Sequence, residues 1–154
     1  GGQESRRRAG TENVVAIAGF GAAAAAARRD LEHVARIRDL RDSLEAELVR
    51  TNPDSVLVAT DAPRLPNTTL VAMPGKQSET LVIKLDLAGI AVSAGAACSS
   101  GKVGTSHVLE AMGVAPDIAR GAVRVSLGPS STADDVQRFV AAWNAATGRP
   151  AMAA

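Results

Sequence analysis

Apolar residues recur at helical spacing between residues 31 and 48, and this pattern limits the possible folds more than any other feature of the chain. Arg, Asp and Glu fill most positions between them, which is typical of an amphipathic helix with one buried face. An alanine run over residues 22–27 also favours helix. We therefore expect one long helical region that begins near Thr11 and ends at Asn52-Pro53-Asp54. The apolar members of the pattern are Leu31, Val34, Ile37, Leu40, Leu44 and Leu48.

The hydrophobic period changes after residue 54. Short apolar runs closed by Pro, Gly or polar loops predict strands over residues 55–59, 68–73, 90–92 and 122–127. Helical spacing returns over residues 78–88 and 105–112, and again after Thr132, which is a good N-cap. The sequence thus predicts an α+β fold: one long helix, then a small sheet of three or four strands with helices packed on it.

The composition bounds the class of protein. The chain has 154 residues, and 46% of them are hydrophobic but only 2% aromatic, so its core must be aliphatic. Basic and acidic residues number 17 and 16, a balance that gives no case for binding nucleic acid or an anionic membrane. The sequence shows neither a secretory signal nor an apolar stretch of membrane-spanning length, so we expect a cytoplasmic protein.

Cys98 is the single cysteine, which excludes an intrachain disulfide and leaves two interpretations. A lone cysteine in an intracellular domain is most often a small buried apolar residue. However, Cys98 lies among Gly, Ala and Ser between residues 93 and 104, and Lys102 follows four positions later. That composition is typical of a loop, and nearby positive charge favours the thiolate. A nucleophilic Cys98 is therefore the functional hypothesis.

Arg124 lies in the predicted strand 122–127, where Val123 and Val125 point to the opposite face. One interpretation is an arginine on an edge strand in solvent. The other is a carboxylate clamp, because a guanidinium offers two parallel N–H donors that match a carboxylate and a strand holds it more firmly than a loop. Both interpretations remain open on the residues alone.

The N-terminal segment is the third candidate site. Gly10 and Thr11 follow the run Arg6-Arg7-Arg8 and lead into the predicted first helix. Backbone N–H groups at a helix start, a hydroxyl and nearby guanidinium groups suit an anion. A solvated basic loop with Thr11 as a plain N-cap explains the same residues, and from the physical chemistry alone we favour that simpler interpretation.

Two other patterns lead to no site. Residues 19–24 match a loose dinucleotide-binding pattern, but helix-like sequence precedes them where such a site needs a strand. One cysteine and two widely separated histidines, His33 and His107, do not make a zinc site, so we expect no bound metal.

Five phrases of the sequence, in order, resemble those of cysteine desulfurases. These enzymes form a branch of the class-V aminotransferase family typified by the nitrogen-fixation and iron–sulfur assembly desulfurases. The resemblance covers residues 1 to about 145, and five phrases in order are far more specific than any one of them. The phrases are GGQESRRRAGTEN at 1–13, PNT at 66–68, SAGAACSSG at 93–101, SHVLEAMG at 106–113 and VRVSLG at 123–128.

The resemblance implies a fold-type I enzyme that depends on pyridoxal 5'-phosphate and works as a homodimer. Residues 1–30 would be the end of the large cofactor-binding domain, with an interface loop and helix. Residues 31–154 would be the C-terminal small domain with the active-site cysteine loop. The implied reaction converts L-cysteine to L-alanine and leaves a persulfide on the enzyme. A sulfur-acceptor or scaffold protein would take that sulfur for iron–sulfur cluster or thiocofactor assembly.

The resemblance also implies roles for single residues. Cys98 would be the nucleophile, Arg124 would bind the substrate carboxylate, and Thr11 would contact the cofactor phosphate across the dimer interface. The chain departs from the family at the lysine that holds the cofactor, which in the family follows a histidine shortly before the GGQE phrase. No lysine of this chain follows a histidine; its lysines are Lys76, Lys84 and Lys102.

We therefore expect a C-terminal fragment of a cysteine desulfurase that is inactive by itself. Two alternatives stay open. The chain could instead belong to a selenocysteine lyase or another class-V aminotransferase, although the small residues around Cys98 favour the desulfurase. It could also be a non-catalytic module for interaction or dimerisation.

Overall fold

The structure of the chain falls into two compact units, Gly1–His33 and Val34–Ala154. It is a computed structural model that describes residues 1–95 and 106–149. Among these residues, no helix combines the length and the apolar character that crossing a membrane would require. The assignment of residues 1–30 and 31–154 to the two domains of a larger enzyme stays a prediction.

The first unit is a short 3-10 turn followed by a helix. Element η1 spans Gln3–Arg6, α1 spans Val14–Asp30 and the 3-10 helix η2 spans Leu31–His33. Asn13 caps α1, because its side chain accepts a hydrogen bond from the Ala16 N–H at 3.0 Å. The expectation that the helix begins at Thr11 is therefore wrong, since the capping oxygen comes from Asn13.

The expected single long helix is two helices. Element η2 separates α1 from α2, which spans Val34–Thr51. The apolar spacing could not reveal this break, because a 3-10 turn also brings residues three apart onto one side. Helix α2 buries Ile37, Leu44 and Leu48, as the periodicity predicted. Helix α1 buries none of its residues.

Four antiparallel strands form the sheet, in the order β1-β2-β4-β3. Strands β2 and β4 have five residues each, and β1 and β3 have two each. The strand expected at 90–92 forms at 93–94 instead, because Ile90 and Val92 pack against the core without joining a ladder. The strand bounds are Val56–Leu57 for β1, Thr68–Ala72 for β2, Ser93–Ala94 for β3 and Ala122–Ser126 for β4.

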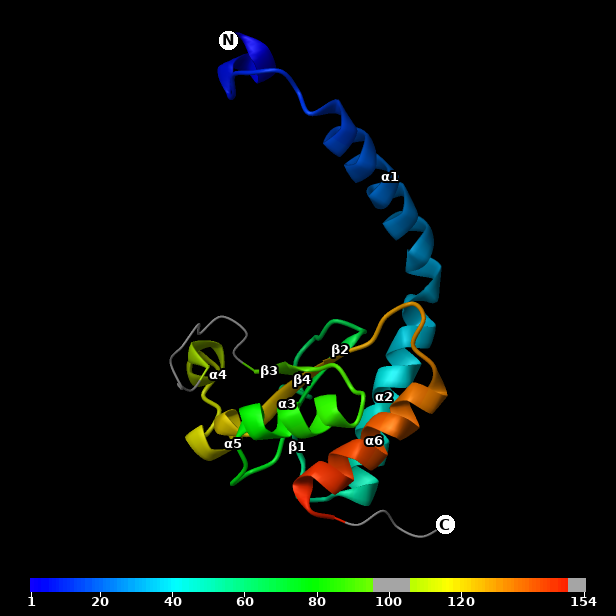
Figure 1. Cartoon of the computed structure of the whole chain (residues 1–154), viewed down its shortest axis with the longest axis vertical. Helices are drawn as coiled ribbons and strands as arrows, with labels where there is room; N and C mark the ends of the chain where they lie inside the picture. The colour runs from blue at the N-terminus through cyan, green and yellow to red at the C-terminus, as the bar shows by residue number, and fades with distance from the viewer. Residues whose placement is uncertain (96–105, 150–154) are drawn as a thin grey trace. The chain divides into compact units, whose positions relative to one another are not determined.

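The main core lies on one face of the sheet, under α2, α3 (Ser78–Leu87) and α6 (Ala133–Thr147), and Figure 1 shows these three helices beside one another. Val71, Val123 and Val125 point from the strands into this core. It is largely aliphatic, as predicted, with Phe139 and Trp143 stacked at a centroid distance of 6.1 Å. The helices contribute Leu44, Leu48, Leu81, Leu85, Val136, Phe139, Val140, Trp143 and Ala146.

Helix α6 is fixed at both ends of its buried face. At its start, Thr132 and Asp135 form the reciprocal capping box, so the predicted N-cap is confirmed. Near its end, the indole N–H of Trp143 donates to Ser55 Oγ at 2.8 Å, and both residues are buried. This bond satisfies the one polar atom of the largest core side chain.

A second hydrophobic cluster covers one end of the opposite face of the sheet. Helices α4 (His107–Ala111) and α5 (Pro116–Arg120) lie over that end, and α5 was not foreseen because five residues are too few to show a period. The second cluster formed there contains Val58, Ala72, Leu109, Ala119 and Ala122. Within residues 34–95 and 106–149, no further helix covers this face, and the candidate site lies on it.

Candidate functional site

A row of four residues crosses the sheet beside the end that α4 and α5 cover. Ser93 pairs with Arg124, and Arg124 pairs with Leu70. The pairing continues to Val58, whose N–H donates to the Leu70 carbonyl at 3.0 Å. Paired residues of a sheet point to the same face, so these four side chains lie next to one another. We refer to them as the Arg124 row.

Arg124 is exposed on the open face, whereas Val123 and Val125 beside it are buried on the other. Within the described residues, the Arg124 guanidinium has no hydrogen-bond or ion-pair partner. Strand β4 lies between β2 and β3, so the interpretation of Arg124 as an edge-strand residue is wrong. The arginine stands on an inner strand of the sheet, and no described residue occupies its donors, which is what a carboxylate clamp requires.

Cys98 lies outside the described residues, but both ends of its segment are described. At the N-terminal end, the Gly95 N–H donates to the Ala122 carbonyl at 2.9 Å. A Cβ at Gly95 would lie 3.2 Å from the Ala122 carbonyl oxygen and 3.4 Å from Leu109 Cδ1, so this position has little room for a side chain. At the C-terminal end, buried Ser106 caps α4 by accepting the Leu109 N–H at 3.4 Å.

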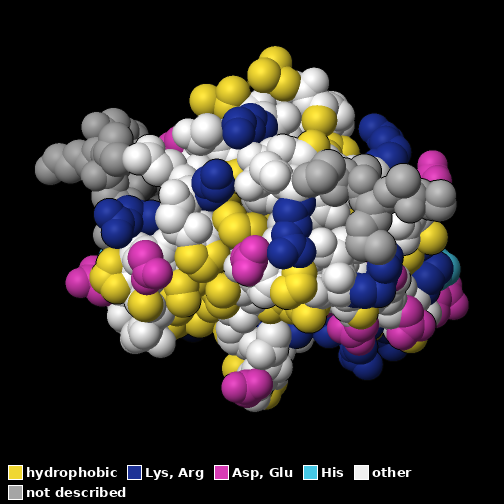
Figure 2. All heavy atoms as spheres, turned by 90° about the horizontal axis from the view of Figure 1, so that it is seen from below, with side chains coloured by type: hydrophobic (Ala, Val, Ile, Leu, Met, Phe, Trp, Pro, Cys, Tyr) yellow, Lys and Arg dark blue, Asp and Glu magenta, His cyan; other side chains and the backbone are white. Residues whose placement is uncertain are grey.

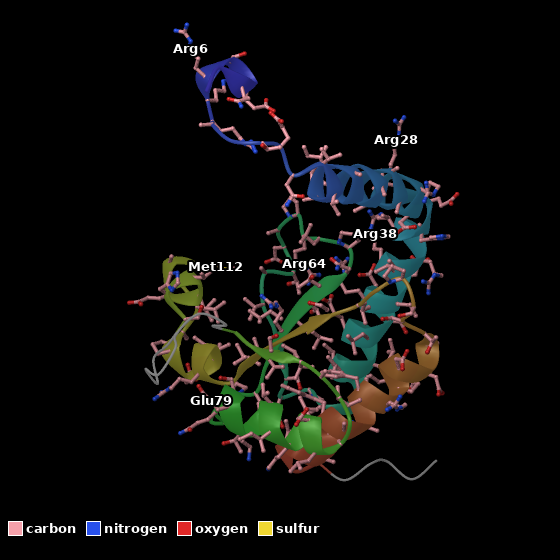
Figure 3. The ribbon with its side chains drawn as sticks, turned by 45° about the horizontal axis from the view of Figure 1, so that its top comes forward. Arg6, Arg28, Arg38, Arg64, Glu79 and Met112 are labelled. Atoms are coloured by element: carbon pink, nitrogen blue, oxygen red, sulfur yellow. The ribbon has the colours of Figure 1, made fainter. Side chains whose placement is uncertain are left out.

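An open apolar pocket of about 230 Å³ adjoins the Arg124 row. Val58 and Leu70 of the row line it, together with Met112, which follows α4. Arg64 and Met112, labelled in Figure 3, come from the connection before β2 and from the end of α4. The remaining lining residues are Ala59, Leu65 and Thr68. Nothing in the local sequence pattern predicted this pocket, because its walls come from segments far apart in the chain.

The arginine of that pocket, Arg64, is neutralised by Glu45 of α2. Its two terminal nitrogens donate to the two carboxylate oxygens at 2.6 and 3.0 Å, and both side chains are largely buried. Burial by itself raises the pKa of Glu45, but the hydrogen bonds and charge of Arg64, with the nearby Thr69 hydroxyl and the charge of Arg41, outweigh it and leave that pKa below its ordinary value. Arg41 also donates to the Leu65 carbonyl at 2.7 Å. These bonds fix the connection before β2 onto α2, and Arg64 has no charge left for a ligand.

Thr11 belongs to the first unit, in a connection without regular secondary structure. Arg8 donates to the carbonyls of Gly10 and Thr11 at 3.2 and 3.0 Å, which shapes the backbone beside the threonine. Thr11 is exposed, so its hydroxyl is accessible to an anion. Upstream, Glu4, Ser5 and Arg6 have φ of 51°, 55° and 67°, a left-handed run that costs roughly 1–2 kcal/mol per residue. Strain of this kind is common where backbone is shaped for binding.

The two described lysines, Lys76 and Lys84, lie outside the Arg124 row. Lys84 lies on α3, and its Nζ donates to the Ala146 carbonyl at 3.0 Å. Lys76 is exposed in the turn before α3. Lys84 is therefore bonded to the end of α6, and Lys76 lies in a turn.

Neither the surface drawn in Figure 2 nor the metal-ligand residues that the structure describes add a further site. On the face drawn in Figure 2, basic and acidic side chains are interspersed among hydrophobic and neutral ones. In the part of the chain that the structure describes, His, Cys, Asp and Glu form no group of three or more suited to a metal ion. The open sheet face with Arg124 is therefore the principal candidate site of the second unit.

Known proteins match the chain in sequence and in fold. Residues 1–139 match the family aminotransferase class-V. A cysteine desulfurase of Gluconacetobacter diazotrophicus is 44% identical over 141 residues, which are 91% of this chain and 35% of that protein. The cysteine desulfurase NifS of Azotobacter vinelandii is 39% identical over 141 residues, again 91% and 35%. The chain thus spans about a third of the length of the curated relatives it matches.

Solved structures agree with this. The X-ray structure of a NifS-like protein from Rickettsia africae superposes with a TM-score of 0.82 at 38% identity, and covers 96% of this chain and 38% of its own. A second NifS-like protein gives a TM-score of 0.75 at 35% identity, with 91% and 35% covered. The α+β fold expected from the sequence, a long helical region and a small sheet with helices packed on it, is confirmed.

Proposed function

The chain belongs to the aminotransferase class-V family, and from this membership we propose that it is the C-terminal part of a cysteine desulfurase. The whole enzyme would convert L-cysteine to L-alanine and hold the released sulfur as a persulfide on Cys98. The names of the matched relatives support the reaction class. The arrangement of the second unit supports the roles of the residues.

The observation that carries the proposal is the pairing of Ser93 with Arg124. It connects the candidate carboxylate clamp directly to the strand that leads into the Cys98 segment. Three residues of chain reach at most about 11 Å, so the sequence alone keeps Cys98 within that distance of Gly95. This pairing supports the proposal, because a small amino acid held by its carboxylate at Arg124 would lie beside the strand that leads into the Cys98 segment.

In the proposed reaction, Arg124 binds the carboxylate of L-cysteine through paired N–H donors. The Cys98 thiolate attacks the substrate sulfur, so that an S–S bond forms while the substrate C–S bond breaks. The electron pair of the broken bond stays on the substrate carbon, which takes up a proton and leaves as L-alanine. The outer sulfur of the persulfide then passes to a sulfur-acceptor or scaffold protein for iron–sulfur cluster or thiocofactor assembly, and the Cys98 thiolate is the leaving group.

Pyridoxal 5'-phosphate, when bound, would supply the electron sink for this reaction. Thr11, with its exposed hydroxyl and neighbouring arginines, would hold the cofactor phosphate across the interface of a homodimer. We also propose that the 154-residue chain alone does not desulfurate cysteine, because Lys84 is engaged with Ala146 and no lysine follows a histidine. The purified chain mixed with the cofactor should then lack the absorbance band at about 400 nm that arises when the cofactor is bound covalently to a lysine.

The experiment that tests the function is Cys98→Ser in the full-length protein, with L-alanine and protein-bound persulfide measured together. We expect alanine formation from L-cysteine to fall to background and the persulfide to disappear, while cofactor absorbance stays unchanged. A variant that still makes alanine and persulfide at the parental rate would show that Cys98 is not the nucleophile. Parallel assays with L-selenocysteine distinguish a selenocysteine lyase, for which the selenium substrate would be strongly preferred.

The exposed apolar side chains of α1 favour a second function, association through this helix. Val14, Val15, Ile17 and Phe20 are 59–84% exposed, although α1 has 17 residues and a regular cap. A non-catalytic dimerisation or interaction module would need these residues and would not need Cys98. Sedimentation of the chain with Ile17 and Phe20 changed to Ser tests this role without any assay of desulfuration. We propose a cytoplasmic location for either function, and no nucleic-acid partner.

A further inference from the structure

We propose that Leu70 is a positioning residue for Arg124: it holds the arginine stem upright on the open sheet face and so sets the affinity for the substrate carboxylate. The inference rests on the proposed function, because it assigns Leu70 a role in the same substrate site. It concerns a residue that neither the sequence motifs nor the apolar periodicity singled out.

The register of the sheet places Leu70 beside Arg124. Leu70 and Arg124 are direct partners across β2 and β4. Directly paired residues of antiparallel strands have Cβ atoms about 4.5–5.5 Å apart, and their side chains stand side by side. On the other side of Arg124 the partner is Ser93, whose side chain is too short to support a long aliphatic stem. Leu70 is thus the bulky neighbour of Arg124 within the row.

The surroundings of Leu70 are mainly apolar. Leu70 is half-buried and lines the apolar pocket with Val58 and Met112. Arg64, the charged residue of that pocket, is bound on both terminal nitrogens by Glu45. Among the described residues, the flank of Arg124 toward β2 is therefore apolar and carries no competing free charge. The opposite flank leads through Ser93 to the Cys98 segment.

The physical consequence is a restriction of the Arg124 side chain. An arginine stem packs well along an apolar surface while its head stays in water. Each rotamer-rich side chain that must be ordered on binding weakens affinity, and a stem already packed on Leu70 loses less freedom. Removal of Leu70 should therefore weaken substrate binding without changing the reacting groups.

The test is Leu70→Ala in the full-length protein, assayed for desulfuration of L-cysteine. We expect KM to rise about three- to tenfold and kcat to stay within about twofold of the parental value. Leu70→Met keeps the bulk and should restore the parental KM. Leu57→Ala is the matched control, because Leu57 is also half-buried but faces the main core from the neighbouring strand.

A double-mutant cycle with Arg124→Gln separates this inference from the proposed function. If Leu70 acts through Arg124, Leu70→Ala adds no further increase in KM to Arg124→Gln. An unchanged KM in Leu70→Ala, beside a raised KM in Arg124→Gln, would overturn the inference and leave the function intact. An unchanged KM in Arg124→Gln would instead refute the proposed clamp.

A measurement on the 154-residue chain tests, without an activity assay, whether Leu70 restricts the motion of the Arg124 side chain. Side-chain NMR of the arginine Nε–Hε groups gives an order parameter for Arg124, assigned through the signal lost in Arg124→Lys. We expect a clearly lower order parameter in Leu70→Ala than in the parent and in Leu57→Ala. Equal order parameters in all three proteins would show that Leu70 does not hold Arg124.

Discussion

Ser93 and Arg124 are partners across β3 and β4, and two residues later the Gly95 N–H is bonded to the Ala122 carbonyl of the same β4. One inner strand therefore holds both the candidate clamp and the start of the segment that carries Cys98. The distance between these two groups depends on strand pairing, which is more rigid than a loop. Changes that weaken the bonds between β3 and β4 should therefore alter the distance between the clamp and the Cys98 segment.

Arg124→Gln in the full-length protein should raise KM for L-cysteine by about 10- to 100-fold, because a charge-assisted pair of hydrogen bonds to the carboxylate is lost. Steady-state kinetics of alanine formation measure the effect. Arg120→Gln is the control, since Arg120 is also exposed but lies at the end of α5. A KM that rises equally in both variants would point to a general charge effect and against the clamp.

Gly95→Ala should displace the backbone at the start of the Cys98 segment from β4. The added methyl would lie 3.2 Å from the Ala122 carbonyl oxygen and 3.3 Å from its Cβ. Such overpacking costs about 1 kcal/mol of unfolding free energy, and the backbone must move to relieve it. We expect this loss in thermal unfolding of the chain and a lower kcat in the full-length protein. Gly128→Ala meets nothing within 4 Å and should leave both quantities near parental values.

The Glu45–Arg64 pair should make stability depend on pH. The pKa of Glu45 is lowered in the folded chain, so its contribution is fully present above the ordinary glutamate value of about 4.3 and is lost as pH falls through the folded pKa. Glu45→Gln should therefore destabilise the chain at pH 7, and the difference from the parent should shrink below about pH 4. Urea unfolding at pH 7 and pH 3 measures this.

The control for that prediction is Glu47→Gln. Glu47 pairs with Arg50 at 2.6 Å, but the arginine is exposed and the pair lies on the surface of α2. Water and salt screen such a pair, so we expect little change in stability at either pH. If Glu45→Gln and Glu47→Gln change the free energy of unfolding equally at pH 7 and at pH 3, the burial of Glu45 does not make its ion pair more stabilising.

Ser55→Ala should destabilise the second unit by about 1–3 kcal/mol, because the buried Trp143 N–H loses its acceptor. Chemical denaturation followed by the fluorescence of Trp143, the one tryptophan in the chain, gives the free energy of unfolding. Ser43→Ala, an exposed serine on α2, should have no such cost. Equal stability of the two variants would mean that another acceptor replaces Ser55.

Period and capping residues were enough to predict most helices and strands. The apolar positions of α2, the N-cap Thr132 and the strand at Ala122–Ser126 lie where the sequence places them. The break at Leu31–His33 and the short helix Pro116–Arg120 escaped prediction, because three- and five-residue elements show no distinct period.

The candidate site was only partly accessible from the sequence. Arg124 could be assigned to an exposed strand position because its neighbours are apolar, but its inner position needed the strand order β1-β2-β4-β3. The pair Glu45–Arg64 and the row partner Leu70 could not be found, because they join segments 19 and more residues apart through tertiary packing. Cys98 and Thr11 were chosen by composition and by motif, and their roles stay predictions.

The two faces of the sheet have consequences for how such a chain can evolve. Val71, Val123 and Val125 are committed to the core, so most changes there would be removed by selection for folding. Leu70 and Arg124 alternate with them along β2 and β4 but point to the other face, where mutations have weaker effects on stability. Natural variation can therefore explore new substrates on one side of this sheet while the fold is inherited unchanged on the other.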